Sequence, residues 1–349
     1  MKLRGLAEVL PGSPVGNGEM AARFGLHERW LDRMTGNRTR YFCDAAGGPR
    51  NTGDLATAAG AKALTAAAVA PEDLEFLILT TASPDALMPA TVNSVADRLG
   101  INGIPTFQLT SGCAGAMQGL YTARALLAAG LGRGLVIGAD SVSRLWPADG
   151  LSRSMPPAEL VNFALFGDGG GAVIVESDDG DPGLVLDHIV LKTVGLGRKP
   201  AQVVRWYGTD GAPKIQAADG SIVREPMGEE DYRAIAQQVP DLADRTFAEV
   251  LAAAGWECGE VDFVLVPQLN GIMSELIRRR LGVTEQQAIS CVADTGNNGN
   301  ALPFIQLTRA LERIDPRASG ERRLVVVTIE SSKWIVAGAA LRYRGRPAA

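Results

Sequence analysis

Cys113 is the residue whose setting points most directly to chemistry. It lies within residues 110–115 (TSGCAG), between an apolar strand-like segment and a helical segment that opens with very small residues. A cysteine at the start of a helix faces unpaired backbone N–H groups and the positive end of the helix dipole, and both favour the thiolate. The position therefore predicts a nucleophile. The alternative interpretation is a small buried residue that fills a tightly packed site.

Other side chains suited to catalysis are scarce. The chain has two histidines, His27 and His188, and four cysteines with no close pair. The cysteine spacing excludes a CxxC zinc or redox site, and a disulfide framework is not expected in a chain of this size. We interpret His188, which follows a strand-like run, as a structural residue at the surface. So few imidazoles leave little room for a metal site or for histidine-based catalysis.

The elements that must position Cys113 occur twice along the chain. In each segment a turn leads to a buried strand, a helix, a second strand, a small-residue loop, a second helix and closing strands. These elements lie at 69–79, 95–100, 106–109, 110–116, 117–127, 135–138 and 171–175 in the first segment, and at 258–266, 279–282, 288–292, 296–300, 303–311, 324–329 and 338–341 in the second. Short apolar runs that alternate with helical patterns indicate parallel strands with helical crossovers. The sequence therefore predicts an α/β fold built from a duplicated unit.

A polar stretch separates the two segments. Residues 177–183 (SDDGDPG) have the turn chemistry of a linker. We therefore place an N-terminal half at 1–178, which carries Cys113, and a C-terminal half at 184–349, which carries an Asn/Gly loop. Residues 199–229, rich in Gly and Asp, are expected to form an irregular surface excursion, and the sequence assigns no function to them.

Composition agrees with two cores and excludes several classes of protein. A chain of 349 residues is longer than one hydrophobic core usually serves. Hydrophobic residues make up 46% and aromatic residues 5%, which suits α/β packing rather than an aromatic-rich β-sandwich. The net charge of −5 argues against a nucleic-acid binder. No apolar run approaches the roughly 20 residues of a membrane span, and no signal peptide is evident, so we expect a cytoplasmic protein without a membrane partner.

Six motifs appear in the order that one known family shows. They are LP at 10–11, ERWLDRMTGNR at 28–38, SGCAG at 111–115, LFGDGGGA at 165–172, VPQLN at 266–270 and GNNGNALP at 296–303. Together they resemble the β-ketoacyl-acyl carrier protein synthase III family of the thiolase superfamily. The resemblance runs nearly from end to end, and it strengthens the interpretation of Cys113 as the nucleophile.

The resemblance implies a fold, a partner and a site. The fold is the five-layered αβαβα thiolase fold, in a homodimer whose subunits share the wall of the active site. A tunnel admits the pantetheine arm of CoA or of acyl carrier protein, so the acyl group arrives on CoA or phosphopantetheine as a substrate and no other cofactor is expected. Cys113 carries the acyl group as a thioester. Asn297 corresponds to a family Asn that helps to hold the second substrate, although Asn298 and Asn300 leave that register open.

The family's catalytic histidine is missing. In condensing members this His and the Asn hold the carbonyl of the malonyl thioester, so that decarboxylation leaves a stabilised enolate. Here Asn270 falls on the family's Asn of the VPHQAN-like run, with one residue too few after Pro267. Either Gln268 has replaced the histidine, or the histidine has been deleted. Glutamine can donate a hydrogen bond but cannot shuttle a proton as imidazole does.

The C-terminal loop departs as well. Where the family has a glycine-rich loop beside the cysteine, this chain has Glu330, Ser331, Ser332, Lys333 and Trp334. A backbone N–H could still serve an oxyanion hole, and we expect Ser332, Lys333 and Trp334 to reshape the substrate pocket. Lys333 or Glu330 is a candidate for the missing proton-transfer group.

The donor site keeps only part of the family's pattern. Trp30 matches a tryptophan that stacks on the CoA adenine, but the partner arginine falls on Leu160, with Arg153 nearby as a possible substitute. An adenine site that keeps only one of its two side chains favours a carrier-protein donor over CoA. Arg33 could contact the acidic carrier protein, together with the basic residues Arg38, Arg278, Arg279 and Arg280. Exposed arginines at a helix end are otherwise ordinary solvated caps.

Met88 matches the position from which the partner subunit limits the acyl pocket. Ordinary packing at the subunit interface would explain the same residue. The sequence does not distinguish the two explanations.

These observations favour an acyltransferase that forms an acyl-Cys113 thioester and passes the acyl group to a small-molecule alcohol or amine in secondary metabolism. Such an acceptor needs a reactive thioester, an oxyanion hole and a modest base. The first alternative is a decarboxylative β-ketoacyl synthase III in which Gln268 and Asn297 suffice for the carbonyl. The second is a catalytically inactive thiolase-fold subunit that pairs with an active partner.

Overall fold

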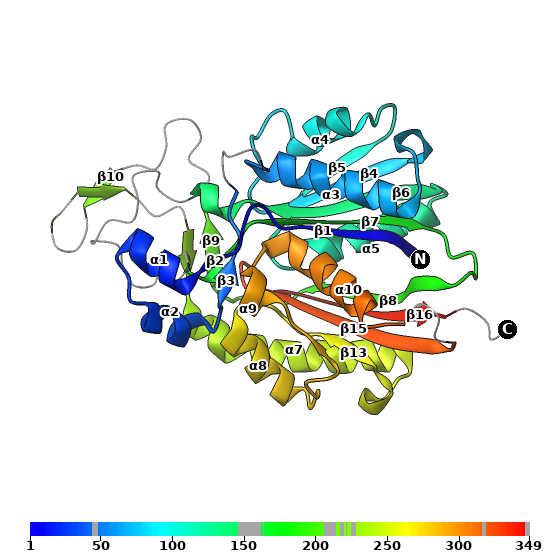
Figure 1. Ribbon diagram of the computed structural model, residues 1–349. Helices are drawn as coiled ribbons and strands as arrows, with labels where there is room; N and C mark the ends of the chain where they lie inside the picture. Colours follow the sequence, from blue (N-terminus) through cyan, green and yellow to red (C-terminus); the bar gives the residue numbers. More distant parts are fainter. Residues whose placement is uncertain are drawn as a thin grey trace.

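The computed structural model describes residues 1–43, 48–145, 162, 164–205, 214–216, 220, 222–224, 228–315 and 319–345. A ten-stranded mixed sheet runs through this part of the chain, in the order β14-β13-β15-β16-β8-β1-β7-β6-β4-β5 (Figure 1). Its strands are β1 (Lys2–Val9), β4 (Phe76–Thr81), β5 (Thr106–Thr110), β6 (Arg133–Asp140), β7 (Gly169–Glu176), β8 (Gly183–Thr193), β13 (Phe263–Leu265), β14 (Ala288–Ile289), β15 (Glu321–Glu330) and β16 (Ile335–Arg344).

The strand pattern repeats in the two halves. In the first half β1, β7 and β6 are antiparallel neighbours, and β6, β4 and β5 are parallel neighbours. In the second half β8, β16 and β15 are antiparallel, and β15, β13 and β14 are parallel. The two sets meet where β1 pairs with β8 over Lys2–Val185 and Leu3–Leu184. The predicted duplication is therefore present in the order and direction of the strands.

Helices form three layers around the two sets of strands (Figure 1). The helices of the described residues are α1 (Asn17–Phe24), α2 (Glu28–Thr35), α3 (Thr52–Ala67), α4 (Thr91–Leu99), α5 (Gly115–Ala128), α7 (Tyr232–Ala254), α8 (Gly271–Arg280), α9 (Val292–Thr295) and α10 (Leu302–Glu312). Helix α3 packs on β1, β6 and β7, and α7 packs on β8, β15 and β16. Helices α5 and α10 contact strands of both halves and form the middle layer. None of the described helices is long and apolar enough to cross a membrane.

The middle layer depends on small side chains. Buried Ala116, Gly119 and Ala123 of α5 let this helix approach the strands closely. A Cβ added to Gly119 would lie 3.0 Å from both Thr80 Cγ2 and Val136 Cγ1. Strand β4 is buried along its whole length, which explains its unbroken apolar start in the sequence. Close packing of α5 on β4 fixes the place of the loop that precedes this helix.

Part of the predicted surface excursion is regular. Strand β9 (Gln202–Val204) pairs with β12 (Gly228–Glu230), and β10 (Lys214–Gln216) pairs with β11 (Ile222–Arg224). A fourth small sheet joins β2 (Val15–Gly16) to β3 (Thr39–Arg40). The expectation of a wholly irregular segment at 199–229 is therefore wrong, because antiparallel pairing satisfies its backbone at both ends.

Candidate active site

The Cys113 loop meets its counterpart from the other half. Asn300 Nδ2 donates 2.8 Å hydrogen bonds to the Ser111 carbonyl and to Asp140 Oδ2. A Cβ on Gly115 would lie 1.8 Å from Asn300 Oδ1, so only glycine fits at the first residue of α5. The duplicated unit thus brings the two small-residue loops, which are far apart in sequence, into direct contact around Cys113.

Cys113 is half-buried and faces a pocket formed mainly by the C-terminal half. The pocket is lined by Cys113, Gln202, Ile235, Val239, Pro267, Gln268, Leu269, Gly299, Leu302, Pro303, Gln306, Val327, Thr328, Ile329 and Ser331. Most of these side chains are apolar, as expected of a pocket that holds an acyl group. Neither His27 nor His188, both in the described part of the chain, lines it.

The thiol of Cys113 is held in its neutral form. Burial raises its pKa to about 12, and the negative charges of Glu330, Glu230 and Asp140 act in the same direction. The expectation that the helix start favours the thiolate is therefore wrong for this arrangement. The helix dipole is a small effect, and it is outweighed by desolvation and by three nearby carboxyl groups.

Glu330 holds the loop on both sides of the cysteine. It lies at the end of β15, is 3% exposed, and its Oε2 accepts hydrogen bonds from Ser111 Oγ at 2.7 Å and Ala114 N at 3.2 Å. Its Oε1 accepts a hydrogen bond from Ser332 Oγ. Both oxygens are thus occupied, which gives Glu330 a positioning role beside Cys113.

Asn297 is fully buried behind the pocket wall. Its Nδ2 donates to the Leu269 carbonyl at 3.3 Å, and its Oδ1 accepts from Gly299 N at 3.1 Å. Leu269 and Gly299 both line the pocket, so Asn297 supports two of its sides. Asn298 is turned away and donates to the Asp168 carbonyl at 2.9 Å. A catalytic role for Asn297 stays a prediction.

Gln268 lies in the pocket wall, but its amide is committed to the backbone. Its Oε1 accepts hydrogen bonds from Cys291 N and Val292 N, both at 2.9 Å, and from Ser290 Oγ at 3.1 Å. Its Nε2 donates to the Val266 carbonyl at 3.0 Å. These hydrogen bonds fix the Gln268 side chain in the wall, and its catalytic role, together with the choice between replacement and deletion of the histidine, stays a prediction.

Asn270 is a helix cap. It is the N-cap of α8, and its Oδ1 accepts from Met273 N at 2.8 Å. This bond satisfies one of the free N–H groups at the start of the helix. The structure thus gives Asn270 a capping role through Oδ1, and contact of its amide with substrate stays a prediction.

The loop after Glu330 points mostly away from the pocket. Lys333 Nζ donates to the Arg198 carbonyl at the surface, 2.5 Å away, and Trp334 is fully buried with its Nε1 donating to the Lys199 carbonyl at 2.8 Å. Ser332 Oγ is directed to Glu330. Of this loop Ser331 lines the pocket. The expectation that Ser332, Lys333 and Trp334 form the substrate pocket, and the candidacy of Lys333 for proton transfer, are therefore wrong in this structure.

The expected donor site is described only in part. Trp30 is half-buried and packs against the clusters that contain Leu31 and Phe166, while Arg33 is exposed on α2. Leu160 and Arg153 lie outside the described residues. Contact of Trp30 or Arg33 with a CoA or carrier-protein donor stays a prediction.

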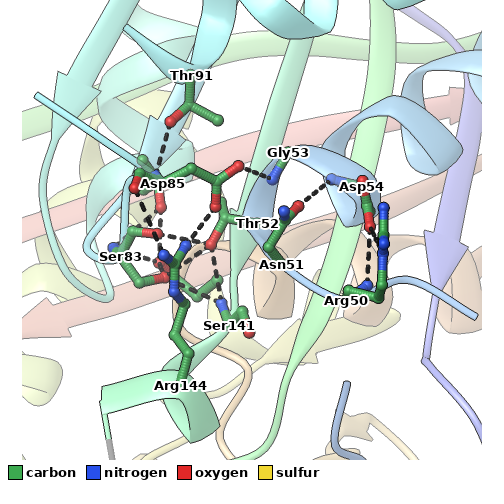
Figure 2. A network of polar contacts seen from close by, with 12 residues as sticks. Arg50, Asn51, Thr52, Gly53, Asp54, Ser83, Asp85, Thr91, Ser141 and Arg144 are labelled. Carbon is green, nitrogen blue, oxygen red and sulfur yellow. Dashed lines mark hydrogen bonds and ion pairs between the residues drawn. The ribbon is translucent and has the colours of Figure 1, made fainter. Parts of the chain in front are cut away.

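Met88 does not line the pocket of its own chain. It is 88% exposed and follows Leu87, which is 68% exposed. Figure 2 shows how Asp85, in the same loop, is anchored: its Oδ2 accepts from Gly53 N at 2.9 Å, its backbone N–H donates to Thr91 Oγ1, and its carboxylate pairs with Arg144. The loop therefore presents two apolar side chains outward from a fixed base.

Glu230 lies next to the pocket, behind Gln202, and it is not predicted from the sequence. This last residue of β12 accepts a 2.6 Å hydrogen bond from the side chain of Gln202, which lines the pocket. In the sequence Glu230 sits in the polar run GEEDY at 228–232, which is typical of a solvated surface. The sequence contains no signal that separates it from its exposed neighbour Glu229.

Comparison with known protein families gives two matches. The model of 3-oxoacyl-[acyl-carrier-protein] synthase III matches residues 107–195, and the model of its C-terminal part matches residues 251–328. The β-ketoacyl-[acyl-carrier-protein] synthase III of Erythrobacter litoralis is 33% identical over 303 residues, which cover 86% of each chain.

Solved structures agree with these matches. A tetronic acid condensing enzyme, AbyA1, is 43% identical with a TM-score of 0.87, covering 97% of this chain and 99% of that one. The 3-oxoacyl-(acyl carrier protein) synthase III of Pseudomonas aeruginosa is 23% identical with a TM-score of 0.78, covering 100% of this chain and 99% of that one, and shows the fold alone. Together with the repeated strand order, these similarities confirm the predicted duplicated thiolase fold.

Proposed function

Because the chain belongs to the 3-oxoacyl-[acyl-carrier-protein] synthase III family, we propose that it is a condensing acyltransferase whose Cys113 sulfur carries the acyl group. The observation that carries the proposal is the position of Cys113, half-buried at the wall of a largely apolar pocket between the two halves. In this proposal the acyl chain lies against the apolar pocket wall and its thioester carbonyl lies beside the N-terminus of α5.

The acceptor supplies its own nucleophile. Without an imidazole in the pocket, decarboxylation of a malonyl thioester has lost a main support for the enolate. A solved structure that is 43% identical is named a tetronic acid condensing enzyme, and tetronic acid is an oxygen heterocycle. A tetronic acid ring contains one acylated carbon and one acylated oxygen. We therefore assign to this chain a substrate pair of two acyl thioesters, one of which carries a hydroxyl group that closes the ring. An alcohol acceptor in secondary metabolism fits this chemistry.

The acyl donor we propose is an acyl-CoA or an acyl carrier protein. The names of the curated relatives contain acyl carrier protein and so support the carrier-protein donor. The active unit we propose is a homodimer. Its partner subunit would cover the exposed pair Leu87 and Met88. No further cofactor is required, because the thioester itself activates the acyl carbonyl.

Mass measurement on the intact protein tests the first step. The wild-type protein is incubated with a panel of acyl-CoA and acyl carrier protein donors, among them 2-hydroxyacyl and 3-oxoacyl thioesters. We expect one acyl adduct that maps to Cys113, and its loss in the Cys113→Ala variant. An adduct that persists in this variant, or its absence with every donor, would contradict the proposal and favour an inactive partner subunit.

A second measurement separates condensation modes. Carbon dioxide released from a malonyl thioester donor, with extension of the acyl adduct by two carbons, would indicate the decarboxylative alternative. Discharge of the adduct by a hydroxylated acyl thioester, with formation of a cyclic product and no carbon dioxide, is the outcome we expect.

A further inference from the structure

The pocket around Cys113 needs a group that moves protons. The thiol is neutral, its proton has to leave as the sulfur attacks, and no histidine lines the pocket of the described chain. Three carboxyl groups contribute to the negative potential at this thiol: Glu330, Glu230 and Asp140. The surroundings of each decide which one is free to accept a proton.

Two of the three carboxyls are fully occupied. Glu330 accepts hydrogen bonds at both oxygens, from Ser111, Ala114 and Ser332. Asp140 Oδ1 accepts from Thr81 Oγ1 at 2.9 Å and from Ala82 N at 2.7 Å, and its Oδ2 accepts from Asn300 N and Asn300 Nδ2, both at 2.8 Å. These carboxylates hold the loops around Cys113 in place, and their lone pairs are in use.

Glu230 differs in having one bare oxygen. Its Oε1 accepts from Gln202 Nε2 at 2.6 Å, whereas its Oε2 is shielded from solvent and has no hydrogen-bond partner. The Tyr232 hydroxyl lies close to this carboxyl, but it is directed to Asn162 Oδ1, to which it donates its single hydrogen. A carboxyl oxygen that is shielded from solvent and has no hydrogen-bond partner lowers the stability of the folded protein. Such groups are often found at functional sites.

The position of Glu230 connects it to the nucleophile. Gln202, which orients its carboxyl, lines the same pocket as Cys113, and Gln202 Oε1 would lie 3.6 Å from a Cβ placed on the adjacent Gly112. Among charged groups Glu230 is second only to Glu330 in raising the pKa of Cys113. Strand β12, at the end of the excursion, thus places the Glu230 carboxyl directly behind Gln202, a residue of the pocket wall, and no histidine of the described chain lines that wall.

We propose that Glu230 is the proton-transfer residue of this pocket: its carboxylate takes the proton of the Cys113 thiol as the sulfur attacks the acyl thioester. The S–H bond breaks and an O–H bond forms on Glu230, while the sulfur electron pair forms the new S–C bond. The donor's C–S bond then breaks with its electron pair on the leaving sulfur, which receives the proton from Glu230. Atoms and charge balance without any other reactant. The assignment rests on the proposed acyl-Cys113 chemistry.

The acidity of Glu230 suits this task. Burial raises the pKa of its carboxyl to about 7, against the opposing effect of the Tyr232 and Gln202 side chains. A group with a pKa near the working pH exchanges a proton most effectively. The titratable groups that face it are Tyr232 from α7 and Cys113 from the nucleophile loop.

The rate of Cys113 alkylation by iodoacetamide tests the role of Glu230 without a cognate substrate. The rate is measured from pH 5.5 to 9 by peptide mass mapping, in the wild type and in Glu230→Gln, Glu230→Asp and Glu229→Gln. If Glu230 accepts the thiol proton, the wild-type rate rises through an apparent pKa near 7. Glu230→Gln then loses this rise and is slower by about tenfold or more at pH 7.5. Gln can still accept the Gln202 hydrogen bond, which limits structural damage.

A faster alkylation of Cys113 in Glu230→Gln would overturn the assignment. If Glu230 only repels the thiolate, its neutralisation lowers the pKa of Cys113 and Glu230→Gln reacts faster than the wild type. An unchanged rate, or a Glu230→Asp variant that also lacks the rise near pH 7, would refute it equally. Glu229→Gln, a neighbouring exposed carboxyl paired with Arg205, should match the wild type. Failure of every thioester donor to acylate the wild type would refute the proposed function separately, because alkylation does not depend on it.

Discussion

The two glutamates beside Cys113 have the same side chain and opposite surroundings. Glu330 accepts hydrogen bonds from three donors, and these bonds fix the nucleophile loop. Glu230 keeps one oxygen bare behind the pocket wall. The contrast predicts that removing the charge of each will change the reactivity of the thiol in opposite directions.

For Glu330 we expect neutralisation to make Cys113 more reactive. Glu330 contributes more than any other charge to the raised pKa of the thiol, so Glu330→Gln should lower that pKa. At a fixed pH near 8.5 the thiolate fraction, and with it the rate of alkylation, should rise by about threefold to tenfold. Alkylation kinetics on mapped peptides measure this change. A slower reaction would show that loss of the loop's hydrogen bonds outweighs the charge.

Glu230 should also make the free energy of unfolding depend on pH. Burial raises its folded pKa from 4.5 to about 7, so the folded protein keeps a proton that the unfolded chain releases. The stability contributed by this proton is complete below about pH 4.5 and is lost as the pH rises through about 7. Relative to Glu230→Gln, the free energy of unfolding of the wild type should fall between pH 5 and 8, by about 3 kcal/mol at most. Urea unfolding of both proteins at several pH values measures this difference, and parallel curves would contradict it.

The sequence predicts a site residue when the residues that mark it are its neighbours in the chain. Cys113 is recognisable because the small residues around it and the following helix lie next to it in the chain. Motif position predicts Gln268 as a catalytic residue and Asn270 as a substrate ligand, and it does not show that the amide oxygens of both accept hydrogen bonds from backbone N–H groups. Glu230 comes to lie beside Gln202 through the pairing of β12 with β9, and no local pattern in the sequence records that pairing.

At the scale of elements, the start of α8 offers a direct test of the cap assignment. Asn270 caps α8 through a 2.8 Å bond to Met273 N, and Asn51 caps α3 through an equal bond to Asp54 N. Asn270→Ala and Asn51→Ala should each lower the free energy of unfolding by about 1 kcal/mol. Neither should change the rate at which Cys113 accepts an acyl group, since a capping side chain acts on its helix. A large loss of acylation in Asn270→Ala alone would return this residue to the substrate site.

The elements themselves were predicted well where they are long and periodic. The expected helix at 117–127 is α5 (Gly115–Ala128), and that at 303–311 is α10 (Leu302–Glu312). Both helices lie between strands of the two halves, so small and apolar residues predominate along them and mark them in the sequence. The short pairs β9–β12 and β10–β11 were missed because strands of three residues with exposed faces have no hydrophobic alternation to detect.

At the scale of the whole molecule, duplication creates the site. Each half delivers a small-residue loop to the N-terminal side of its middle-layer helix, and the two loops interlock through Asn300 and Gly115. The first half supplies the sulfur and the second half supplies most of the pocket wall. Neither half alone would enclose an acyl group. Changes in either loop should therefore affect the reactivity of the same cysteine.

The exposed loop at 84–90 indicates how two molecules would associate. Leu87 and Met88 are 68% and 88% exposed, on a loop whose Asp85 is fixed to α3, to Thr91 and to Arg144. A rigid loop that presents large apolar side chains is typical of a surface that another chain covers. In the proposed homodimer, the partner's copy of this loop would close one side of the pocket.

We therefore expect charge at this loop to separate the subunits. Leu87→Asp combined with Met88→Asp would place two carboxylates in a desolvated interface, and sedimentation should shift from dimer to monomer at micromolar concentration because buried unpaired charges cost several kcal/mol. Leu196→Asp is the matched control, since Leu196 is 100% exposed on a different part of the surface and should leave the assembly unchanged. A dimer that survives the double substitution would place the interface elsewhere. If the dimer dissociates but the alkylation rate of Cys113 is unaltered, the partner's loop forms the interface without closing the pocket.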